Sequence, residues 1–386
     1  MRRERLRTYS LVAASIAVGW IGWSGHVLLL PAGTLFPTIW SLANTRLQAV
    51  SFSAAYFLAA SRGLPQGVAN FYAADIWPGL ILWAVASSAF VIVHCVLWTS
   101  SADWRKPTLY LVACVAMAIP PFGILGWAHP LTAAGVLFPG WGLSGIAAMT
   151  VGLALMTTRL WPTAAIAILG FWLLSAAFWT GSRLPTSWQG ADLEFGASLG
   201  RDQSVERQAQ LAAIVRSYQS GTTVVLPESA IGLWTPTVRH WWQLALGESG
   251  VTVIAGAVVI DRRGYDNILV RISSVGSDVV YRQRMPVPGS MWQPWNSWFH
   301  REGGANAYFF ANPVVDIGDV RAVPLVCYEQ LLIWPVLQSM LHDPDIVLAV
   351  GNGWWTPGTS IVDIQISTSQ AWARLFDKPL VLSFNR

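Results

Sequence analysis

Cys327 and Glu228 are two side chains that could act together as a nucleophile and a base. Cys327 is the only cysteine in the polar C-terminal half of the chain, and it ends the apolar run 323–326. Glu228 ends a similar run, 223–227, about a hundred residues upstream. A thiol at a strand end can be exposed without loss of the core, and a neighbouring carboxylate can take its proton. The pair therefore indicates an enzyme site.

Both residues also have a purely structural explanation. A lone cysteine at the end of a buried strand is often a packing residue, and a glutamate after a proline is common at the start of a helix. Cys95 and Cys114 lie inside apolar segments, so we expect them to be buried and unreactive. No cysteine is then left to form a disulfide with Cys327, so we expect no disulfide.

The segments around the pair alternate between strand and helix patterns. Runs of β-branched and apolar residues predict strands, and apolar residues at helical spacing predict helices. We expect strands over 222–226, 251–260, 267–273, 278–282, 321–326, 346–350 and 380–383. We expect helices over 203–220, 236–246, 331–341 and 361–376. This order is typical of an α/β domain with buried strands.

Two further segments have a chemical and a structural interpretation. The turn Gly351-Asn352-Gly353 could present backbone N–H groups to a developing oxyanion, or it could be a tight turn and nothing more. Met291, Trp292, Trp295 and Trp298 could form a lipid-facing lid or a solvent-shielded loop.

Composition divides the chain into two parts. The 386 residues are 54% hydrophobic and 11% charged, whereas soluble domains carry about 25% charged residues. The apolar residues are concentrated before residue 182 and most acidic residues follow it. We predict a membrane domain over 1–182, with about seven transmembrane helices, and a globular domain over 183–386.

The predicted membrane spans give a consistent orientation. They cover 8–25, 27–44, 47–61, 77–99, 107–128, 131–157 and 160–180, and prolines 31 and 37 could make the second span broken or re-entrant. The basic start of the chain belongs in the cytoplasm by the positive-inside rule, and Arg62 is the one exception to the pattern. We therefore expect a multi-pass inner-membrane protein with a cytoplasmic N-terminus and a periplasmic C-terminal domain.

A set of short motifs resembles the carbon–nitrogen hydrolase (nitrilase) superfamily, in particular its apolipoprotein N-acyltransferase branch. Within 190–386 they are Leu226-Pro227-Glu228-Ser229-Ala230, Tyr265-Asp266-Asn267, Tyr281-Arg282-Gln283-Arg284, Val287-Pro288, Cys327-Tyr328-Glu329, Asn352-Gly353-Trp354-Trp355 and Ala373-Arg374 through Pro379. The stretches 281–288 and 376–386 resemble, more narrowly, nitrilase-like membrane proteins of conjugal plasmid transfer.

The resemblance implies a fold and a mechanism. The fold is an α-β-β-α sandwich, here preceded by a membrane bundle. The implied mechanism uses a Glu–Lys–Cys triad, in which Glu228 is the general base and Cys327 attacks a carbonyl to form a thioester. Glu329 would orient or tune the site.

The chain departs from this pattern at the lysine. Gln283 occupies the position where the family carries it. Gln283 could donate a neutral hydrogen bond to an oxyanion, and Arg282 or Arg284 could supply positive charge without shuttling a proton. The chain has two lysines, Lys106 and Lys378, and Lys378 is the one in the C-terminal domain. It lies far from the motif in sequence.

Two functions remain open. The first is a membrane-anchored amide or acyl-bond hydrolase or acyltransferase, acting on a lipid or lipoprotein in conjugal transfer. The second is a catalytically degenerate domain that serves as an assembly factor of the conjugation machinery. The expected partners are the lipid bilayer, such a substrate and other conjugation proteins. The sequence lacks a metal-ligand cluster, a nucleotide loop and a dense basic patch, so we expect no cofactor, no metal and no direct nucleic-acid binding.

Overall fold

The computed structural model describes residues 2–262, 264–299 and 303–386, and it consists of two compact units. The first unit contains residues 1–182 together with 331–334 and 358–377. The second contains residues 183–330, 335–357 and 378–386. The chain therefore returns to the first unit twice after the main boundary at Ser182.

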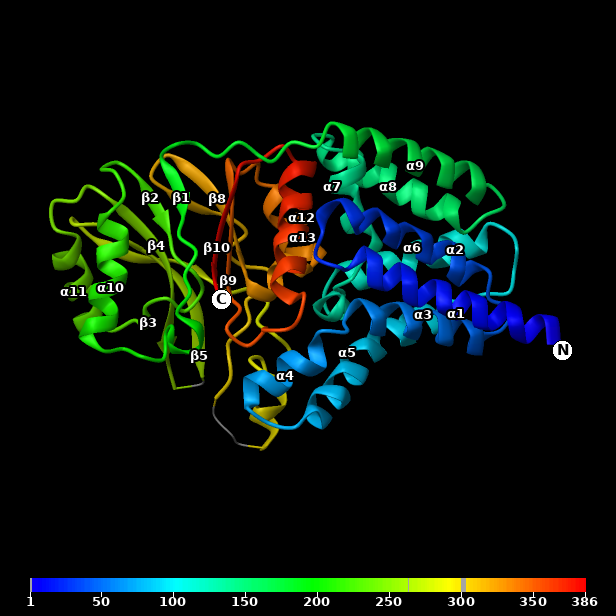
Figure 1. The fold of residues 1–386 in the computed structure, drawn as a ribbon, viewed down its shortest axis with the longest axis horizontal. Helices are drawn as coiled ribbons and strands as arrows, with labels where there is room; N and C mark the ends of the chain where they lie inside the picture. The colour runs from blue at the N-terminus through cyan, green and yellow to red at the C-terminus, as the bar shows by residue number, and fades with distance from the viewer. Residues whose placement is uncertain (1, 263, 300–302) are drawn as a thin grey trace. The chain divides into compact units, whose positions relative to one another are not determined.

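The first unit is helical. Its helices, including the 3₁₀ segments labelled η, are α1 (Arg2–Gly22), η1 (Val27–Leu35), α2 (Phe36–Ser41), α3 (Arg46–Ala60), α4 (Leu64–Tyr72), α5 (Ile76–Val96), α6 (Arg105–Ala118), η2 (Phe122–Leu125), η3 (Pro130–Ala133), α7 (Ala134–Leu137), α8 (Gly142–Met156), α9 (Trp161–Ala177) and α13 (Ile361–Leu375). Figure 1 colours the first of them blue and cyan.

Several predicted spans are interrupted. The expected helix over 107–128 ends at Ala118, before Pro120 and Pro121, because proline lacks the N–H that continues a helix. The expected helix over 131–157 is divided between α7 and α8, and Gly140 adopts a φ of +78° between them. The expected span 27–44 is a 3₁₀ segment followed by a short helix, with Pro31 inside the first.

In the described part of the chain, one helix is long and apolar enough to cross a membrane. This helix is α5. Three shorter stretches are also apolar: Val27–Ser41, Gly142–Met156 and Trp161–Ala177. Seven full-length spans are therefore not observed.

The second unit contains two β-sheets (Figure 1). The first sheet has the order β1-β2-β4-β5-β6, with β3 beside β4; the second has the order β10-β9-β8-β7. The strands are β1 (Trp188–Gly190), β2 (Thr223–Val225), β3 (Gly232–Leu233), β4 (Thr252–Ile260), β5 (Tyr265–Ile272), β6 (Ser277–Arg282), β7 (Val315–Ile317), β8 (Val320–Val326), β9 (Ile346–Asn352) and β10 (Leu380–Asn385). All seven predicted strands are present.

The two sheets enclose a shared apolar core. Val225 and Ile254 of the first sheet pack with Val326 and Leu348 of the second. Because side chains alternate along a strand, neighbouring residues of β2 and β4 point to the opposite face. There they pack against α10 (Val205–Arg216) and α11 (Pro236–Leu246), which lie outside the first sheet in Figure 1.

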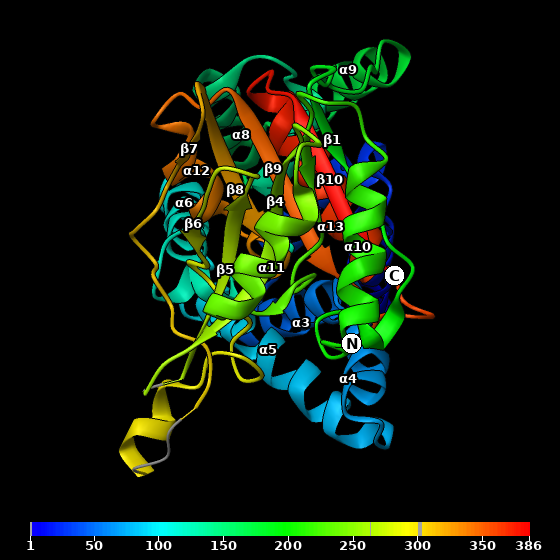
Figure 2. The same cartoon turned by 90° about the vertical axis from the view of Figure 1, so that its left-hand side faces the viewer.

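Strand direction brings the predicted site residues to one end of the sheets. Strands β8, β9 and β10 are mutually parallel and run side by side in Figure 2. Cys327 follows β8 and Asn352 ends β9, so they lie at the carboxyl ends of adjacent strands. The helix α12 (Ile333–Met340) connects these two strands.

Candidate active site

Cys327 has an unusual backbone conformation. It is the first residue of the 3₁₀ turn η6 (Cys327–Leu331), and its φ is +50°. This left-handed region is rarely adopted by residues with a side chain and costs of the order of 1–3 kcal/mol. Ser229, directly after Glu228, also has a positive φ, +61°. Both predicted catalytic residues therefore lie at sharp, strained turns that follow strands.

The structure brings Cys327 and Glu228 into direct contact. The thiol of Cys327 donates a hydrogen bond to the Glu228 carboxylate. The backbone N–H of Asn352 donates to the same carboxylate, and Asn267 Nδ2 lies 2.6 Å from Glu228 Oε1. Glu228 is 5% exposed and Cys327 is 7% exposed. A buried carboxylate in contact with a thiol is the geometry that general-base activation requires.

Burial dominates the protonation of Glu228. It raises the pKa of this carboxyl from 4.5 to about 7. The hydrogen bonds from Asn267, Cys327 and Asn352 oppose the rise, whereas the negative charge of Glu329 adds to it. A pKa near the operating pH is suited to a general base.

Asn267 and Gln283 form a neutral chain beside the base. Asn267 Nδ2 also lies 3.0 Å from Gln283 Oε1, and Gln283 Nε2 donates to the Val326 carbonyl at 3.1 Å. Gln283 is 1% exposed. At the position of the family's lysine, this chain therefore has an amide that joins Asn267 to the backbone just before the nucleophile.

Glu329 holds the nucleophile turn and the 281–285 segment together. It is fully buried. Its carboxylate accepts hydrogen bonds from the Tyr281 hydroxyl (2.9 Å) and from the backbone N–H groups of Arg284 (2.6 Å), Met285 (3.0 Å) and Val326 (2.8 Å). The predicted orienting role of Glu329 is consistent with this position, because no part of it is free to contact a substrate.

The two arginines of the motif point away from the nucleophile. The buried guanidinium of Arg284 donates to the carbonyls of Pro324 and Pro335 at 3.2 and 3.0 Å, and to the Tyr281 hydroxyl. Arg282 forms an ion pair with Asp266. Since Tyr281 and Gln283 face the site, the alternation of β6 directs Arg282 to the opposite face.

The lysines are also engaged elsewhere. Lys106 donates to the Ser41 carbonyl at 2.9 Å. Lys378 pairs with the exposed Asp343 at 2.9 Å and precedes β10. Since β8, β9 and β10 are parallel, Lys378 lies at the end of the sheet opposite Cys327. A strand of six residues spans roughly 20 Å, which a lysine side chain does not bridge.

Two N–H groups of the turn after β9 already have acceptors. The N–H of Asn352 is used by Glu228, and that of Gly353 donates to the Asn385 carbonyl at 2.8 Å. A Cβ on Gly351 would lie 2.6 Å from the Phe384 ring. The turn therefore helps to orient Glu228, and Gly351 leaves room for the Phe384 ring.

Sequence reasoning missed two contributors to the site. Asn267 was part of a motif but had no assigned role, although an asparagine on a buried strand could have been recognised as a polar group in need of a partner. Gly256 lies in β4, and a Cβ there would come within 2.4 Å of the Ser229 nitrogen and 2.6 Å of the Glu228 Cα. Only glycine allows the Glu228 turn to approach β4 this closely.

A cavity of about 550 Å³ opens beside the pair. Asn267, Ser229 and Tyr265 line it together with the apolar side chains of Val258, Ile260 and Met291. Trp292, predicted with Met291 to form a lid or a shielded loop, packs edge-on against Phe309, with 5.1 Å between the ring centroids. Trp295 is 39% exposed, and the side chain of Trp298 lies outside the described residues. The cavity meets the site through Asn267, which contacts Glu228, and Ser229, which follows it.

The fold and the hydrogen-bonded Cys–Glu pair define a class of protein. The chain belongs to the carbon-nitrogen hydrolase family, whose family model matches residues 58–374. The predicted nitrilase-like fold is thereby confirmed, whereas the predicted multi-span bundle is not.

Two relatives match the whole chain. It is 60% identical over 387 residues to the "Probable conjugal transfer protein TraB" of Sinorhizobium fredii, with 100% of both chains covered. It is 55% identical over 397 residues to the "Conjugal transfer protein TraB" of Agrobacterium fabrum, covering 100% of this chain and 94% of the relative. The predicted resemblance to conjugal transfer proteins is therefore confirmed.

A solved carbon-nitrogen hydrolase from Helicobacter pylori G27 is 14% identical, with a TM-score of 0.31. The match covers 42% of this chain and 57% of that one.

Proposed function

We propose that this protein is a thiol enzyme of conjugal plasmid transfer that hydrolyses or transfers an acyl group. Glu228 takes the proton of Cys327, and the thiolate attacks the carbonyl carbon of an amide or ester. The leaving group departs with a proton returned by Glu228, and an acyl thioester remains on Cys327. Water or an acceptor amine then attacks the thioester, with Glu228 again as the base, and the thiol is regenerated.

The observation that carries the proposal is the hydrogen bond from the Cys327 thiol to a buried carboxylate whose pKa is near 7. A packing cysteine has no need of such a partner. Burial of an ionisable group is unfavourable unless it is compensated, and three donors aimed at one carboxylate stabilise its ionised form.

The absence of the motif lysine should lower the rate at which Cys327 is acylated. Loss of one oxyanion donor typically lowers the rate by about 10²–10³. Gln283 is held between Asn267 and the Val326 carbonyl, so its amide offers little compensation. We therefore expect slow acylation, on a substrate that is presented to the protein at the cell envelope.

The competing function is that of an assembly factor with a degenerate site. The neutral Asn267–Gln283 chain favours it, because Asn267 and Gln283 are uncharged and supply no cation beside Glu228. In that case Cys327 is a structural residue, and the partners are other conjugation proteins.

We further propose that the first unit anchors the protein in the inner membrane, with the N-terminus in the cytoplasm and the second unit in the periplasm. Helix α5 is long enough to span a bilayer. Its residues Trp77, Ile81 and Ile92 are 70%, 66% and 58% exposed. Ile166 in α9 and Phe178 directly after α9 are 71% and 73% exposed. Such exposed apolar surface fits lipid contact. The bilayer and a lipid or lipoprotein acyl donor are the partners we propose; direct nucleic-acid binding is not part of the proposal.

The decisive experiment is mass spectrometry of Cys327 in membranes of the native host. We expect an acyl adduct that hydroxylamine releases and that is lost in Glu228→Gln, and the mass of the adduct identifies the acyl group. Conjugation frequency in a Cys327→Ala strain is measured in parallel. An unmodified Cys327 together with unchanged conjugation in Cys327→Ala would support the assembly function instead.

A further inference from the structure

A second cavity borders the Glu228 turn. Its volume is about 270 Å³, and it shares Ser229 and Val258 with the larger cavity. Its polar lining includes Gln203, Asn352 and Arg201. Arg201 is the one charged side chain among its described lining residues, so the cavity has a positive character.

This cavity is lined by residues that adjoin Glu228, namely Ser229 and Asn352. The backbone N–H of Asn352 donates to Glu228. The register of β8 and β9 pairs Val326 with Val350, which places the next residues, Cys327 and Gly351, side by side. Asn352, which lines the cavity, therefore directly follows the residue that lies beside Cys327.

The loop that carries Arg201 packs on the catalytic turn itself. A Cβ on Gly200 would lie 2.3 Å from the Ser229 carbonyl oxygen, and Gly200 has a φ of +74°. Glycine is therefore required at this position. The position of Arg201 is coupled to the turn that holds Glu228.

The guanidinium of the exposed Arg201 lies over an aromatic ring. Its Cζ atom lies 4.0 Å from the centroid of the Trp354 ring, which also lines the cavity. Stacking of this kind holds the plane of the guanidinium and leaves its N–H groups free at the edge. Those N–H groups have the fork geometry that binds a carboxylate or a phosphate at two points.

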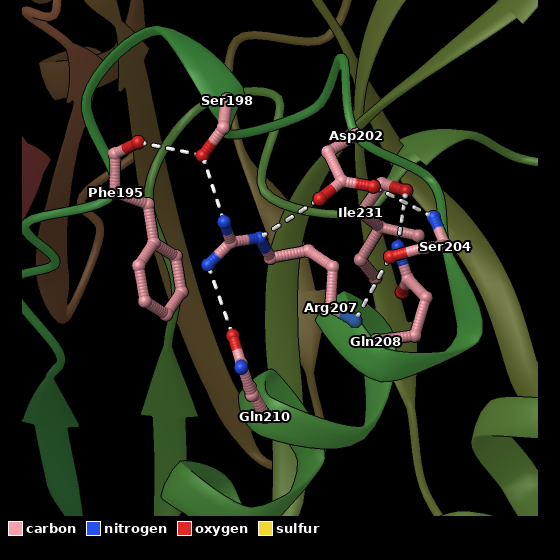
Figure 3. A network of polar contacts seen from close by, with 8 residues as sticks. All are labelled: Phe195, Ser198, Asp202, Ser204, Arg207, Gln208, Gln210 and Ile231. Carbon is pink, nitrogen blue, oxygen red and sulfur yellow. Dashed lines mark hydrogen bonds and ion pairs between the residues drawn. The ribbon is translucent and has the colours of Figure 1, made fainter.

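The neighbouring acidic residue does not neutralise Arg201. Asp202 accepts from the backbone N–H of Ser204 at 3.0 Å, which lowers the pKa of Asp202, and lies 3.6 Å from Arg207 Nε (Figure 3). Within the described residues, Arg201 forms no ion pair with a carboxylate. Its charge therefore remains available to a ligand.

Polar and ring contacts anchor the loop near Arg201. Arg207 donates to Ser198 Oγ at 3.0 Å and lies 4.3 Å over the Phe195 ring (Figure 3). Asn385 Nδ2 donates to the Gly196 carbonyl and to Asn352 Oδ1, both at 2.8 Å. Because these contacts already anchor the loop, ligand binding at this cavity requires little additional ordering of it.

We infer that this cavity binds an anionic oxygen group, a carboxylate or a phosphate, of the molecule that reaches Cys327. Arg201 is the residue that binds the anion and Trp354 positions it. The inference deepens the proposed function, since it defines the class of substrate, but the binding itself does not depend on acyl chemistry.

The test measures alkylation of Cys327 by N-ethylmaleimide in the full-length protein in detergent, with peptide mass spectrometry to separate Cys327 from the other two cysteines. Glutarate or inorganic phosphate is the anionic competitor, and glutaramide is the neutral one. We expect the anions to slow alkylation and glutaramide to have no effect. Arg201→Gln should weaken this protection about tenfold or more, since a charge-assisted hydrogen bond is lost.

Two variants serve as references. Arg216→Gln removes an arginine from the last turn of α10 and should retain full protection, so an effect of overall charge is excluded. Arg201→Lys keeps the charge but loses the planar fork, and should give partial protection. Equal alkylation with and without the anions, or equal protection in Arg201→Gln, overturns the inference.

A further comparison separates the two sources of the anion. Detergent micelles doped with phosphatidylglycerol are compared with phosphatidylcholine micelles, in the presence and absence of phosphate. Protection by phosphatidylglycerol at lower concentration than phosphate supports a lipid headgroup, and the reverse order supports a small soluble anion. If protection is seen but no acyl adduct forms in native membranes, the anion site stands and the acyl chemistry fails.

Discussion

The Asn267 amide donates to both Glu228, at 2.6 Å, and Gln283, at 3.0 Å, and so occupies the space between the base and the residue that replaces the lysine. Gln283 directly follows β6 and lies opposite Asn267 of β5, to whose carbonyl the Gln283 N–H donates at 2.8 Å. A neutral hydrogen-bonded pair therefore supports Glu228 where an ammonium group is expected. Burial raises the pKa of the Glu228 carboxyl and the hydrogen bond from Asn267 opposes that rise, while the neutral pair offers no positive charge to an oxyanion.

The rate of Cys327 acylation should increase with pH, with a midpoint near 7. Only the ionised Glu228 can accept the thiol proton, and burial raises the pKa of its carboxyl to about 7. Glu228→Gln should lower the rate by about 10²–10⁴. The measurement is the rate of p-nitrophenolate release from p-nitrophenyl acetate between pH 5 and 9. The same midpoint in Glu228→Gln would show that another group controls the reaction.

Glu228→Gln should stabilise the folded protein at alkaline pH. The carboxyl has a pKa of about 7 in the folded protein and an ordinary value of 4.5, so the folded state binds more protons between these values. Stability conferred by the wild-type residue is therefore lost as pH rises from 4.5 through 7. The expected gain for the variant at pH 8 is about 3 kcal/mol, and the gain at pH 5 is small.

Thermal unfolding in detergent at pH 5 and pH 8 tests whether Glu228→Gln stabilises the folded protein only at the higher pH. The exposed Glu206, in the first turn of α10, provides the matched control Glu206→Gln. A variant Glu228→Gln that melts at or below the wild-type temperature at pH 8 would contradict the prediction.

Gly256→Ala should slow acylation by displacing the base. The added Cβ would overlap the Ser229 nitrogen and the Glu228 Cα, so the turn must move away from β4. A displacement of about 1 Å can lower the rate about 10²-fold. Gly276→Ala is the control, because no atom lies within 4 Å of a Cβ there. Equal effects of the two substitutions on p-nitrophenolate release would argue against close packing as the cause.

Gln283→Lys should strengthen the site. An ammonium group near Glu228 favours the ionised carboxylate, so the pH midpoint should fall by about one unit or more. The cation can also stabilise the oxyanion, which should raise the rate by about 10²–10³. Gln283→Met, of similar length and neutral, separates charge from shape. If the lysine variant folds but shows neither change, the assembly function gains support.

Glu329→Ala should loosen the 281–285 segment before it affects the rest of the protein. The Glu329 carboxylate accepts hydrogen bonds from the Tyr281 hydroxyl and from the backbone N–H groups of Arg284, Met285 and Val326. Each buried donor left unsatisfied costs about 1–3 kcal/mol. Hydrogen exchange of 281–285 should rise sharply, whereas Glu206→Ala should leave it unchanged. Unaltered exchange in Glu329→Ala would mean that other groups hold this segment.

The sequence predicted the strands of the second unit well because their pattern is strong. Runs such as 251–260 are almost wholly apolar, as befits strands that are largely buried on both faces. The helical unit was harder to predict. Its apolar residues continue through Pro120 and Gly140, so hydropathy alone joined segments that the backbone separates.

The sequence by itself determined that a cysteine and a glutamate follow buried strands, that glutamine stands in place of the motif lysine, and that the chain resembles the carbon–nitrogen hydrolases. These are local features: residue type, strand period and motif order. Only the tertiary structure decided that the Cys327 thiol meets Glu228, that Asn267 and Gly256 hold the base, and that Arg282, Arg284 and Lys378 point elsewhere. The reason is that these contacts depend on strand pairing, register and the approach of two sheets, and the identity of a residue does not specify which distant residue will lie opposite it.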